Sequence, residues 1–163
     1  MPDILSEPSA SLGDLRHEVE RLRLLHAISL EFSASLDFDE LLPRVFNRVV
    51  TTLGAEGGSI WITEGDLLKC RLAIGGRSER LIGAEVPVGT GFVGDVAQKQ
   101  RTTVVTKAQA DPRYQESIDR TSQDLELNVM ATAMVSEGVT VGAIQVSNKN
   151  TGDGMFDAGD REL

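Results

Sequence analysis

The spacing of apolar residues changes once along the chain, and this change limits the folds that the chain can adopt. Between residues 14 and 53, apolar residues recur every three or four positions, which is the period of an amphipathic helix. From residue 59 onward, short runs alternate between apolar and polar residues and are bounded by glycine, which is typical of strands and hairpins. Helices that precede a set of hairpins predict an α+β domain with a largely antiparallel sheet.

Two helices are expected before the strands. The first begins at Asp14 and has an apolar seam with alternating spacings of three and four residues, which suits a partner helix. The seam consists of Leu12, Leu15, Val19, Leu22, His26 and Ser29. A second stripe, expected to face the helix's own domain, consists of Leu25, Ile28 and Phe32. The second helix has N-caps available at Asp37 and Asp39 and is expected to end at Gly54 or Gly57.

Short runs with a period of two predict the extended segments of the domain. They are residues 59–63, 67–74, 85–88, 102–105, 129–135 and 139–148. Glycine-containing turns at 64–66 and 137–138 join two pairs of these segments as hairpins. The polar, charged segment of residues 107–128 is long for a simple connection, and segments of this kind are usually functional or disordered. Residues 156–163 are expected to begin a last helix that continues past the end of the chain.

Gly89, Gly91 and Gly94 lie in the stretch VPVGTGFVGDV and form the pattern G-x-G-x-x-G. In a dinucleotide-binding domain this pattern leads from a strand into a long crossover helix. Here the preceding strand is short, and the expected helix ends before Arg101. The glycines therefore indicate tight turns and close packing of a short helix. The backbone N–H groups that open this helix could still hold a phosphate.

The charge balance and the cysteine count exclude several classes of function. The chain has 16 lysines and arginines against 25 aspartates and glutamates, so nucleic acid and anionic membranes are not expected partners. The one cysteine, Cys70, can form neither a disulfide framework nor a zinc cluster, which fits a reducing cytoplasm. No apolar run approaches the length of a membrane span. Residues 1–13 lack the features of a signal peptide and are expected to be a disordered leader.

Several stretches, taken in order, resemble the GAF domains, a family of small-molecule sensor modules in signalling proteins. They read SIWI, AIGG, VPVGTGFVGDVAQ, TTVVTKAQADPRY and VGAIQVSNK. The resemblance covers residues 24–163 and overlaps a signalling and dimerisation helix expected at residues 14–36. It implies the α+β GAF fold, which is PAS/profilin-like. In that fold a six-stranded antiparallel sheet carries helices on one face and a ligand pocket under a lid on the other.

The chain is more closely similar to the cyclic-nucleotide-binding GAF domains of phosphodiesterases and cyanobacterial adenylyl cyclases, whose signature is N-K-(x)n-F-x3-D-E. The matching residues are Asn148, Lys149, Phe156 and Asp160. Arg161 stands where the final Glu is expected. The resemblance implies that Lys149 and Asp160 pair beneath the pocket and hold the last loop to the sheet. Ordinary turn and helix-cap chemistry is the alternative interpretation of these residues.

The resemblance also implies a set of pocket residues. They are Ser59, Ala73, Ile74, Phe92, Val93, Gln115, Asp119, Ser122, Glu126 and Gln145. The first two strands would contact the base, backbone N–H groups at the short helix would meet the cyclic phosphate, and residues 115–126 would belong to the lid. Gln145 is polar within the apolar run VGAIQV, so it either faces solvent or needs a buried partner. Asp119 and Glu126 would help only as acceptors for base or ribose, and a solvated lid helix is the alternative.

The sequence therefore predicts a regulatory sensor domain, not an enzyme, that binds cAMP or cGMP and needs no further cofactor or metal. A parallel homodimer through the terminal helices would transmit the signal to an output domain beyond Leu163. Cys70 has no second cysteine, and His17 and His26 lie on the first helix, which argues against sulfoxide reductase, bilin, haem and metal-binding relatives. The alternative is a ligand-free GAF module for dimerisation or interaction.

Overall fold

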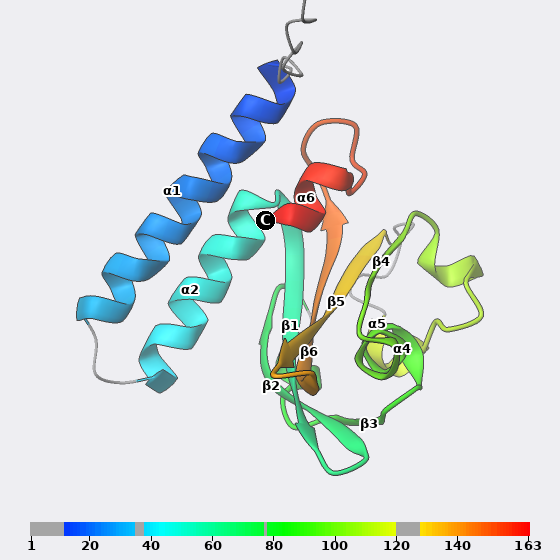
Figure 1. Ribbon diagram of the computed structural model, residues 1–163. Helices are drawn as coiled ribbons and strands as arrows, with labels where there is room; N and C mark the ends of the chain where they lie inside the picture. The colour runs from blue at the N-terminus through cyan, green and yellow to red at the C-terminus, as the bar shows by residue number, and fades with distance from the viewer. Residues whose placement is uncertain (1–11, 35–37, 77, 120–127) are drawn as a thin grey trace, which may run out of the picture.

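The chain folds as two leading helices followed by a sheet with short connecting helices (Figure 1). The computed structural model describes residues 12–34, 38–76, 78–119 and 128–163. The helices are α1 (Leu12–Ala34), α2 (Phe38–Thr52), α3 (Ser78–Leu81), α4 (Gly91–Lys99), α5 (Glu116–Asp119) and α6 (Ala158–Glu162), with a 3₁₀ turn at Ala108–Ala110. The strands are β1 (Ala55–Glu64), β2 (Leu67–Ile74), β3 (Glu85–Pro87), β4 (Thr102–Val105), β5 (Val129–Ser136) and β6 (Val139–Lys149). Most of the leader predicted at residues 1–13 lies outside the described residues.

The strands form one six-stranded antiparallel sheet in the order β3-β2-β1-β6-β5-β4. Ser59 in β1 lies opposite Gln145 in β6 and opposite Ala73 in β2, so these three residues share one face near the centre of the sheet. In Figure 1, α1 and α2 lie on one side of the sheet and α4 lies on the other. This arrangement confirms the predicted α+β, PAS/profilin-like fold.

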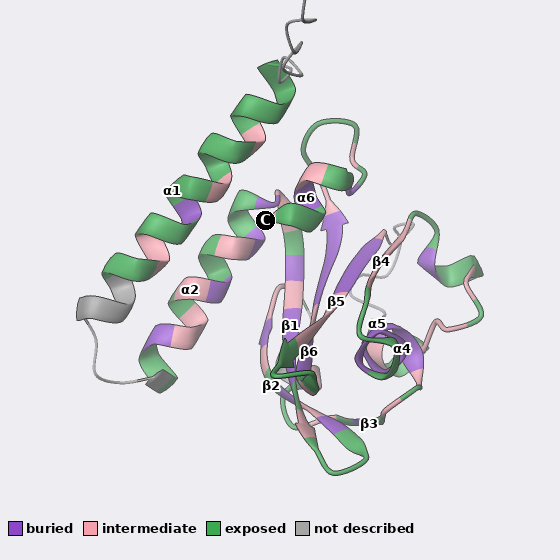
Figure 2. Ribbon diagram, viewed as in Figure 1, coloured by how far each residue is buried: buried purple, intermediate pink, exposed green. Residues whose placement is uncertain are grey.

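Apolar residues pack on both faces of the sheet, because successive residues of a strand point to opposite faces. The cluster on the α2 side consists of Phe46, Val50, Leu53, Ile60, Met130, Val146 and Phe156. The cluster on the α4 side includes Trp61, Leu68, Phe92, Val93, Val96 and Val129. In Figure 2 the buried residues concentrate on the strands and α4, whereas α1 is largely exposed. The sheet is therefore the shared wall of two packed layers.

The glycine pattern around α4 serves turns and close packing. A Cβ at Gly94 would lie 2.6 Å from the carbonyl oxygen of Pro87, so a larger residue cannot be placed there without a shift. Gly89 and Gly91 have φ values of 92° and 68°, in the left-handed region that glycine adopts without strain. The strands that flank α4 in sequence, β3 and β4, lie at opposite edges of the sheet. The dinucleotide-binding crossover is thereby excluded, as the sequence predicted.

Helix α1 packs against α2 through a stripe that differs from the predicted one. Leu24 is 4% exposed and faces inward, whereas Leu25 is 51% exposed. The prediction that Leu25 faces the domain is therefore wrong, because one residue along a helix turns the side chain by about 100°. Ile28 is half-buried as expected, and the side chain of Phe32 lies outside the described part.

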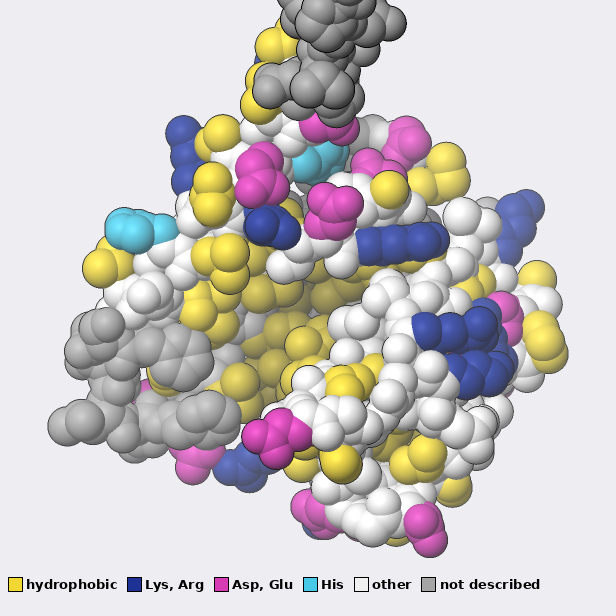
Figure 3. All heavy atoms as spheres, viewed as in Figure 1, with side chains coloured by type: hydrophobic (Ala, Val, Ile, Leu, Met, Phe, Trp, Pro, Cys, Tyr) yellow, Lys and Arg dark blue, Asp and Glu magenta, His cyan; other side chains and the backbone are white. Residues whose placement is uncertain are grey.

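The predicted seam of α1 lies on the surface. Its apolar members Leu12, Leu15, Val19 and Leu22 are all exposed, and His26 is exposed as well. Figure 3 shows apolar side chains on the visible surface of α1 between charged ones. Among the helices that the structure describes, none is both long and apolar enough to cross a membrane.

Candidate functional site

The centre of the sheet provides a buried floor with two polar side chains. Ser59, Ala73 and Gln145 are 3%, 8% and 5% exposed, and strand register brings them together on the α4 face. The Ser59 hydroxyl accepts a hydrogen bond of 2.8 Å from Trp61 Nε1, which lies two residues along on the same face. The floor is therefore apolar around its rim and polar at Ser59 and Gln145.

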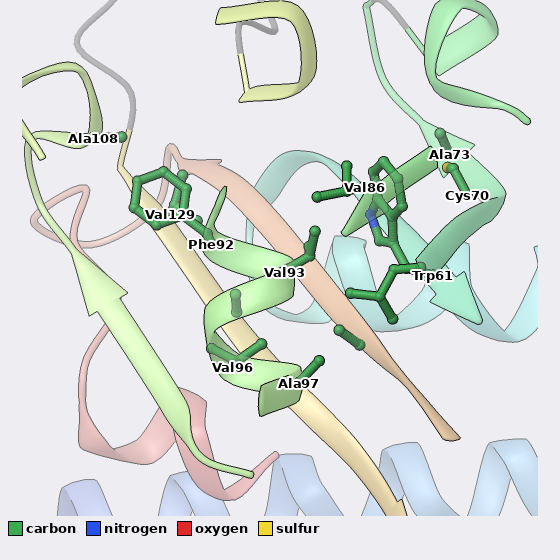
Figure 4. Packing of buried hydrophobic residues seen from close by; sticks show 13 residues of the cluster. Trp61, Cys70, Ala73, Val86, Phe92, Val93, Val96, Ala97, Ala108 and Val129 are labelled. Atoms are coloured by element: carbon green, nitrogen blue, oxygen red, sulfur yellow. The ribbon is translucent and has the colours of Figure 1, made fainter. Parts of the chain in front are cut away.

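The first turn of α4 lies against this floor. Phe92 and Val93 are fully buried, and in Figure 4 Phe92 lies toward Val129, whereas Val93 lies toward Trp61. The N-cap Thr90 makes no side-chain capping hydrogen bond to this helix. The first N–H groups of a helix have no acceptor within the helix, and the helix dipole favours negative charge at this end. The start of α4 can therefore receive an anionic group.

Residues 106–119, the covering segment, close the site from the side opposite the sheet. Tyr114 and Ile118 pack against the apolar cluster on the α4 side, and Gln115 lies against Gly91 at the start of α4. Asp119 ends the segment and is completely buried. Its carboxylate accepts hydrogen bonds from the Gln145 side-chain amide at 3.1 Å and from the Gln115 backbone N–H at 2.7 Å. Within the described ranges, the Asp119–Gln145 hydrogen bond thus joins the covering segment to the floor.

Burial changes the acid chemistry of this contact. Desolvation raises the pKa of Asp119 to about 6, although the hydrogen bonds from Gln115 and Gln145 act in the opposite direction. The Gln145 side-chain oxygen is buried and has no hydrogen-bond partner within the part of the chain that the structure describes. A buried acceptor without a donor is costly. The site therefore holds an acceptor oxygen that a ligand with an N–H or O–H group could satisfy.

A charge network, which the sequence did not reveal, ties the covering segment to α4. Asp95 is 5% exposed and forms ion pairs with Lys99, with Arg101 at 3.2 Å and with Arg113 at 2.9 Å. Arg113 also pairs with Asp111 at 2.8 Å, and its guanidinium lies 5.2 Å from the centre of the Phe92 ring. Burial opposes ionisation of Asp95, but hydrogen bonds from the three cations outweigh it and lower the pKa to about 2.

The residues of the Asn-Lys…Phe…Asp motif lie at the end of β6 and at α6. Lys149 Nζ contacts Asp160 Oδ2 at 2.5 Å, and both side chains are largely buried. Asp160 also completes a capping box with Asp157 at the start of α6, so the pairing and the cap chemistry occur together. Phe156 belongs to the cluster on the α2 side, below the sheet relative to the candidate site. Asn148 has φ of 56° and donates to Glu56 Oε2 at 3.1 Å.

The structure does not bring all predicted pocket residues together. Ile74 packs against the cluster on the α2 side, so its side chain lies on the opposite face from Ser59 and Ala73. Ser122 and Glu126 lie in residues 120–127, outside the described residues. Phe92, Val93, Gln115, Asp119 and Gln145 do lie around one site.

The chemistry of Cys70 does not favour nucleophilic catalysis. The thiol is buried in β2 and lies 3.5 Å from the Leu72 carbonyl oxygen. Burial raises its pKa to about 11, so the reactive thiolate is scarce at neutral pH. Over the ranges that the structure describes, no group of three or more His, Cys, Asp or Glu side chains is placed to hold a metal ion.

Together, the sheet, α4 and the covering segment define an α+β domain that encloses a small polar site against its central strands. A model of the GAF domain family matches residues 35–163. The chain therefore belongs to the GAF domain family, whose members are sensor and regulatory modules of signalling proteins. No curated protein matches the chain.

Solved structures with this fold include domains of different proteins. The GAF domain of a phosphoenolpyruvate-protein phosphotransferase from Coxiella burnetii has a TM-score of 0.74 at 16% identity, covering 88% of this chain and 85% of its own. The A. aeolicus nlh2 GAF domain in an inactive state has a TM-score of 0.69 at 18% identity, and the match covers 84% of each chain. The free methionine-R-sulfoxide reductase from Neisseria meningitidis, in complex with its substrate, has a TM-score of 0.70 at 19% identity. The match covers 97% of this chain and 87% of the reductase chain. These similarities establish the fold, which regulatory domains and enzymes share.

Proposed function

We propose that this domain is a regulatory sensor that binds a cyclic nucleotide between its sheet and the covering segment. The observation that carries the proposal is the buried contact of Asp119 with Gln145. Gln115 links this contact to the start of α4, because its backbone N–H donates to Asp119 and its side chain lies against Gly91. It supplies hydrogen-bonding side chains for a base. The helix start supplies N–H groups for a phosphate.

In this proposal the ligand replaces the contact between the covering segment and the floor, which Asp119 and Gln145 form in the structure. The cyclic phosphate lies at the N–H groups of Phe92 and Val93. The base lies over Ser59 and Ala73 and meets Gln145. The covering segment then rests on the ligand instead of on the floor. A ligand shifts the balance of two conformations only through its different affinity for them.

The signal would pass through the terminal helices of a parallel homodimer. The exposed seam of α1 has the spacing that two parallel helices require. Helix α1 also touches α6, since a Cβ at Gly159 would lie 2.7 Å from His17 Nδ1. A change in the packing of α1 would therefore reach α6, and through it an output domain beyond Leu163.

A ligand-free dimerisation module is the second candidate. Arg161 stands in place of the Glu that ends the cyclic-nucleotide motif, and the Asp119 carboxylate already accepts hydrogen bonds from Gln145 and Gln115. Catalysis of the sulfoxide reductase type is not proposed, because the raised pKa of Cys70 leaves little thiolate and the chain has no second cysteine.

Thermal unfolding with cAMP, cGMP, cyclic dinucleotides and AMP, each near a millimolar concentration, tests the proposal. A ligand at about 100 times its Kd stabilises a protein by about 2.7 kcal/mol, which shifts the Tm by several degrees. We expect a shift with a cyclic nucleotide and none with AMP. Gln145→Met should abolish the shift, whereas Gln109→Met, at an exposed position of the 3₁₀ turn, should keep it. If none of these nucleotides shifts the Tm, and the Tm rises with protein concentration, the result would favour the dimerisation module.

A further inference from the structure

A pocket, which we call the hairpin pocket, lies on the α2 side of the sheet at the β1–β2 hairpin. Its volume is about 410 Å³, within the range of small-molecule pockets. The lining comes from β1, β2 and the segment before β3, and it includes Ile62, Glu64, Lys69, Arg71, Ile82 and Gly83. Successive residues of a strand point to opposite faces, so Ile62 and Glu64 lie on the face opposite to Trp61, which packs on the α4 side. The hairpin pocket is therefore separate from the candidate site.

Helix α2 leaves this end of the sheet uncovered. Arg71 Nη2 contacts Asp39 Oδ1, in the first turn of α2, at 2.6 Å, and from there α2 runs toward the start of β1, away from the hairpin (Figure 1). Ile62 and Ile82 both line the pocket, and both are exposed. Such a surface favours a ligand with an apolar body, because contact with the ligand removes the two side chains from water.

One charge of the hairpin pocket lacks a counter-ion. Lys69 pairs with Glu85 at 3.8 Å, and Arg71 pairs with Asp39. Glu64 forms no ion pair with a residue that the structure describes. Since both cations are paired, the Glu64 carboxylate gives the pocket an excess of negative charge, and the whole chain has a net charge of −9. The charge of the pocket therefore favours a positively charged occupant.

We propose that the hairpin pocket binds a small organic cation with an apolar body, such as an aromatic amine. The apolar body lies between Ile62 and Ile82, and the ammonium group meets Glu64. An inorganic cation would leave the isoleucines exposed to water. An anion would have to displace Glu85 or Asp39 from the cation with which it pairs. The combination of apolar walls and one uncompensated carboxylate therefore selects the class of ligand.

The hairpin pocket touches the layer of helices through Arg71. This side chain lines the pocket, and its ion pair with Asp39 joins β2 to the first turn of α2. Helix α1 packs on α2. A bound cation thus lies next to a contact between the sheet and the helices, on the face opposite to the candidate site. The pocket gives the domain a second binding site that does not depend on the proposed cyclic nucleotide.

An NMR titration of the isotope-labelled chain with tryptamine and with indole-3-propionate tests the proposal, because the two probes share an indole body and differ in charge. We expect tryptamine to shift the amide resonances of residues 62–64, 69–71 and 82–83. It should bind about fivefold more tightly than indole-3-propionate. No shifts at millimolar tryptamine, shifts confined to other residues, or equal affinities of the two probes would overturn the proposal.

Two matched pairs of variants separate the charge from the apolar walls. Glu64→Gln should remove the preference for tryptamine, whereas Glu137→Gln, in the exposed turn of the β5–β6 hairpin, should keep it. Ile82→Ser should weaken binding of both probes by on the order of fivefold, whereas Val139→Ser, at another exposed apolar position, should change neither affinity. A preference that survives in Glu64→Gln would contradict the role of Glu64. No cyclic nucleotide enters these titrations, so their outcome is independent of the test of the proposed function.

Discussion

Asp119 carries a carboxylate in surroundings that favour its neutral form. Its pKa of about 6 lies above the ordinary value of 3.8, so the folded state binds a proton more tightly than the unfolded chain does. Between these two values the folded state holds more protons, and stability falls as the pH rises. At neutral pH the ionised side chain therefore strains the closed site.

We expect this strain to be visible as a pH-dependent difference between the unaltered chain and Asp119→Asn. From about pH 4 to pH 7 the free energy of unfolding of the unaltered chain should fall, relative to the variant, by roughly 3 kcal/mol, since one pKa unit corresponds to 1.36 kcal/mol. Urea unfolding of both proteins across this range measures the difference. A difference that stays constant with pH would show that Asp119 titrates normally.

Individual site residues differ in how far the sequence could predict them. Gln145 was predictable, because a polar residue in an apolar strand needs a buried partner. Its partner Asp119 came only from the resemblance, since nothing local distinguishes it from a solvated acid. Ile74 could have been separated from Ala73 by strand alternation alone. Asp95 and Arg113 were missed, because an ion pair across 18 residues has no sequence period.

At the scale of elements, α4 depends on how closely it approaches the end of β3. The absence of a side chain at Gly94 allows this approach, and the Pro87 carbonyl oxygen occupies the space that a Cβ would need. The helix start that faces the candidate site is therefore set by backbone contact as well as by the packing of Phe92 and Val93.

Gly94→Ala should reduce the free energy of unfolding by about 1–3 kcal/mol, the usual cost of overpacking a tight site. It should also weaken ligand binding, because the start of α4 must shift. Gly65→Ala provides the comparison: this turn glycine has φ of 63° and open space around it, so only the backbone cost of about 1 kcal/mol applies. Chemical denaturation compares the two. A Gly94→Ala protein as stable as the unaltered chain would show that α4 can move away freely.

Element positions were predicted well and their boundaries less well. The predicted hairpins and the short helix after Gly91 are present. β1 begins at Ala55 instead of Ser59, because Gly57 and Gly58 extend the strand rather than ending the helix before it. A Cβ at Gly58 would lie 2.8 Å from the Gln145 carbonyl oxygen, so this glycine permits close strand approach. The sequence around a glycine does not show whether the residue permits close approach of two strands or forms a turn.

At the scale of the whole molecule, α1 carries apolar residues on two sides, and among its described side chains those of the predicted seam are uncovered. Leu24 packs toward α2, while the seam through Val19 and Leu22 lies in solvent. The proposed homodimer would bury this seam. The sequence predicted the seam from spacing alone, but the inward stripe was misplaced, because apolar residues occur on more than one side of α1 and tertiary contacts decide which side is buried.

Val19→Asp should prevent formation of the proposed homodimer. Each of the two copies would place a charge in the apolar seam, so we expect the dimer Kd to rise on the order of a hundredfold. Val139→Asp, an equally drastic change at an exposed position of the β5–β6 hairpin, should leave it unaltered. Analytical ultracentrifugation over a concentration series gives both values. A dimer that survives Val19→Asp would have another interface.

Neighbouring residues of β6 belong to different compartments of the molecule. Gln145 faces the candidate site, and Val146, the next residue, packs in the layer beneath α2. Because a peptide plane is rigid and both layers are densely packed, the backbone at Gln145 cannot be displaced without moving Val146. A backbone shift at Gln145 on the α4 face of the sheet would therefore also move Val146 on the α2 face. Such a shift would reach the layer that packs against α1 without a hinge or a chain of intermediate residues.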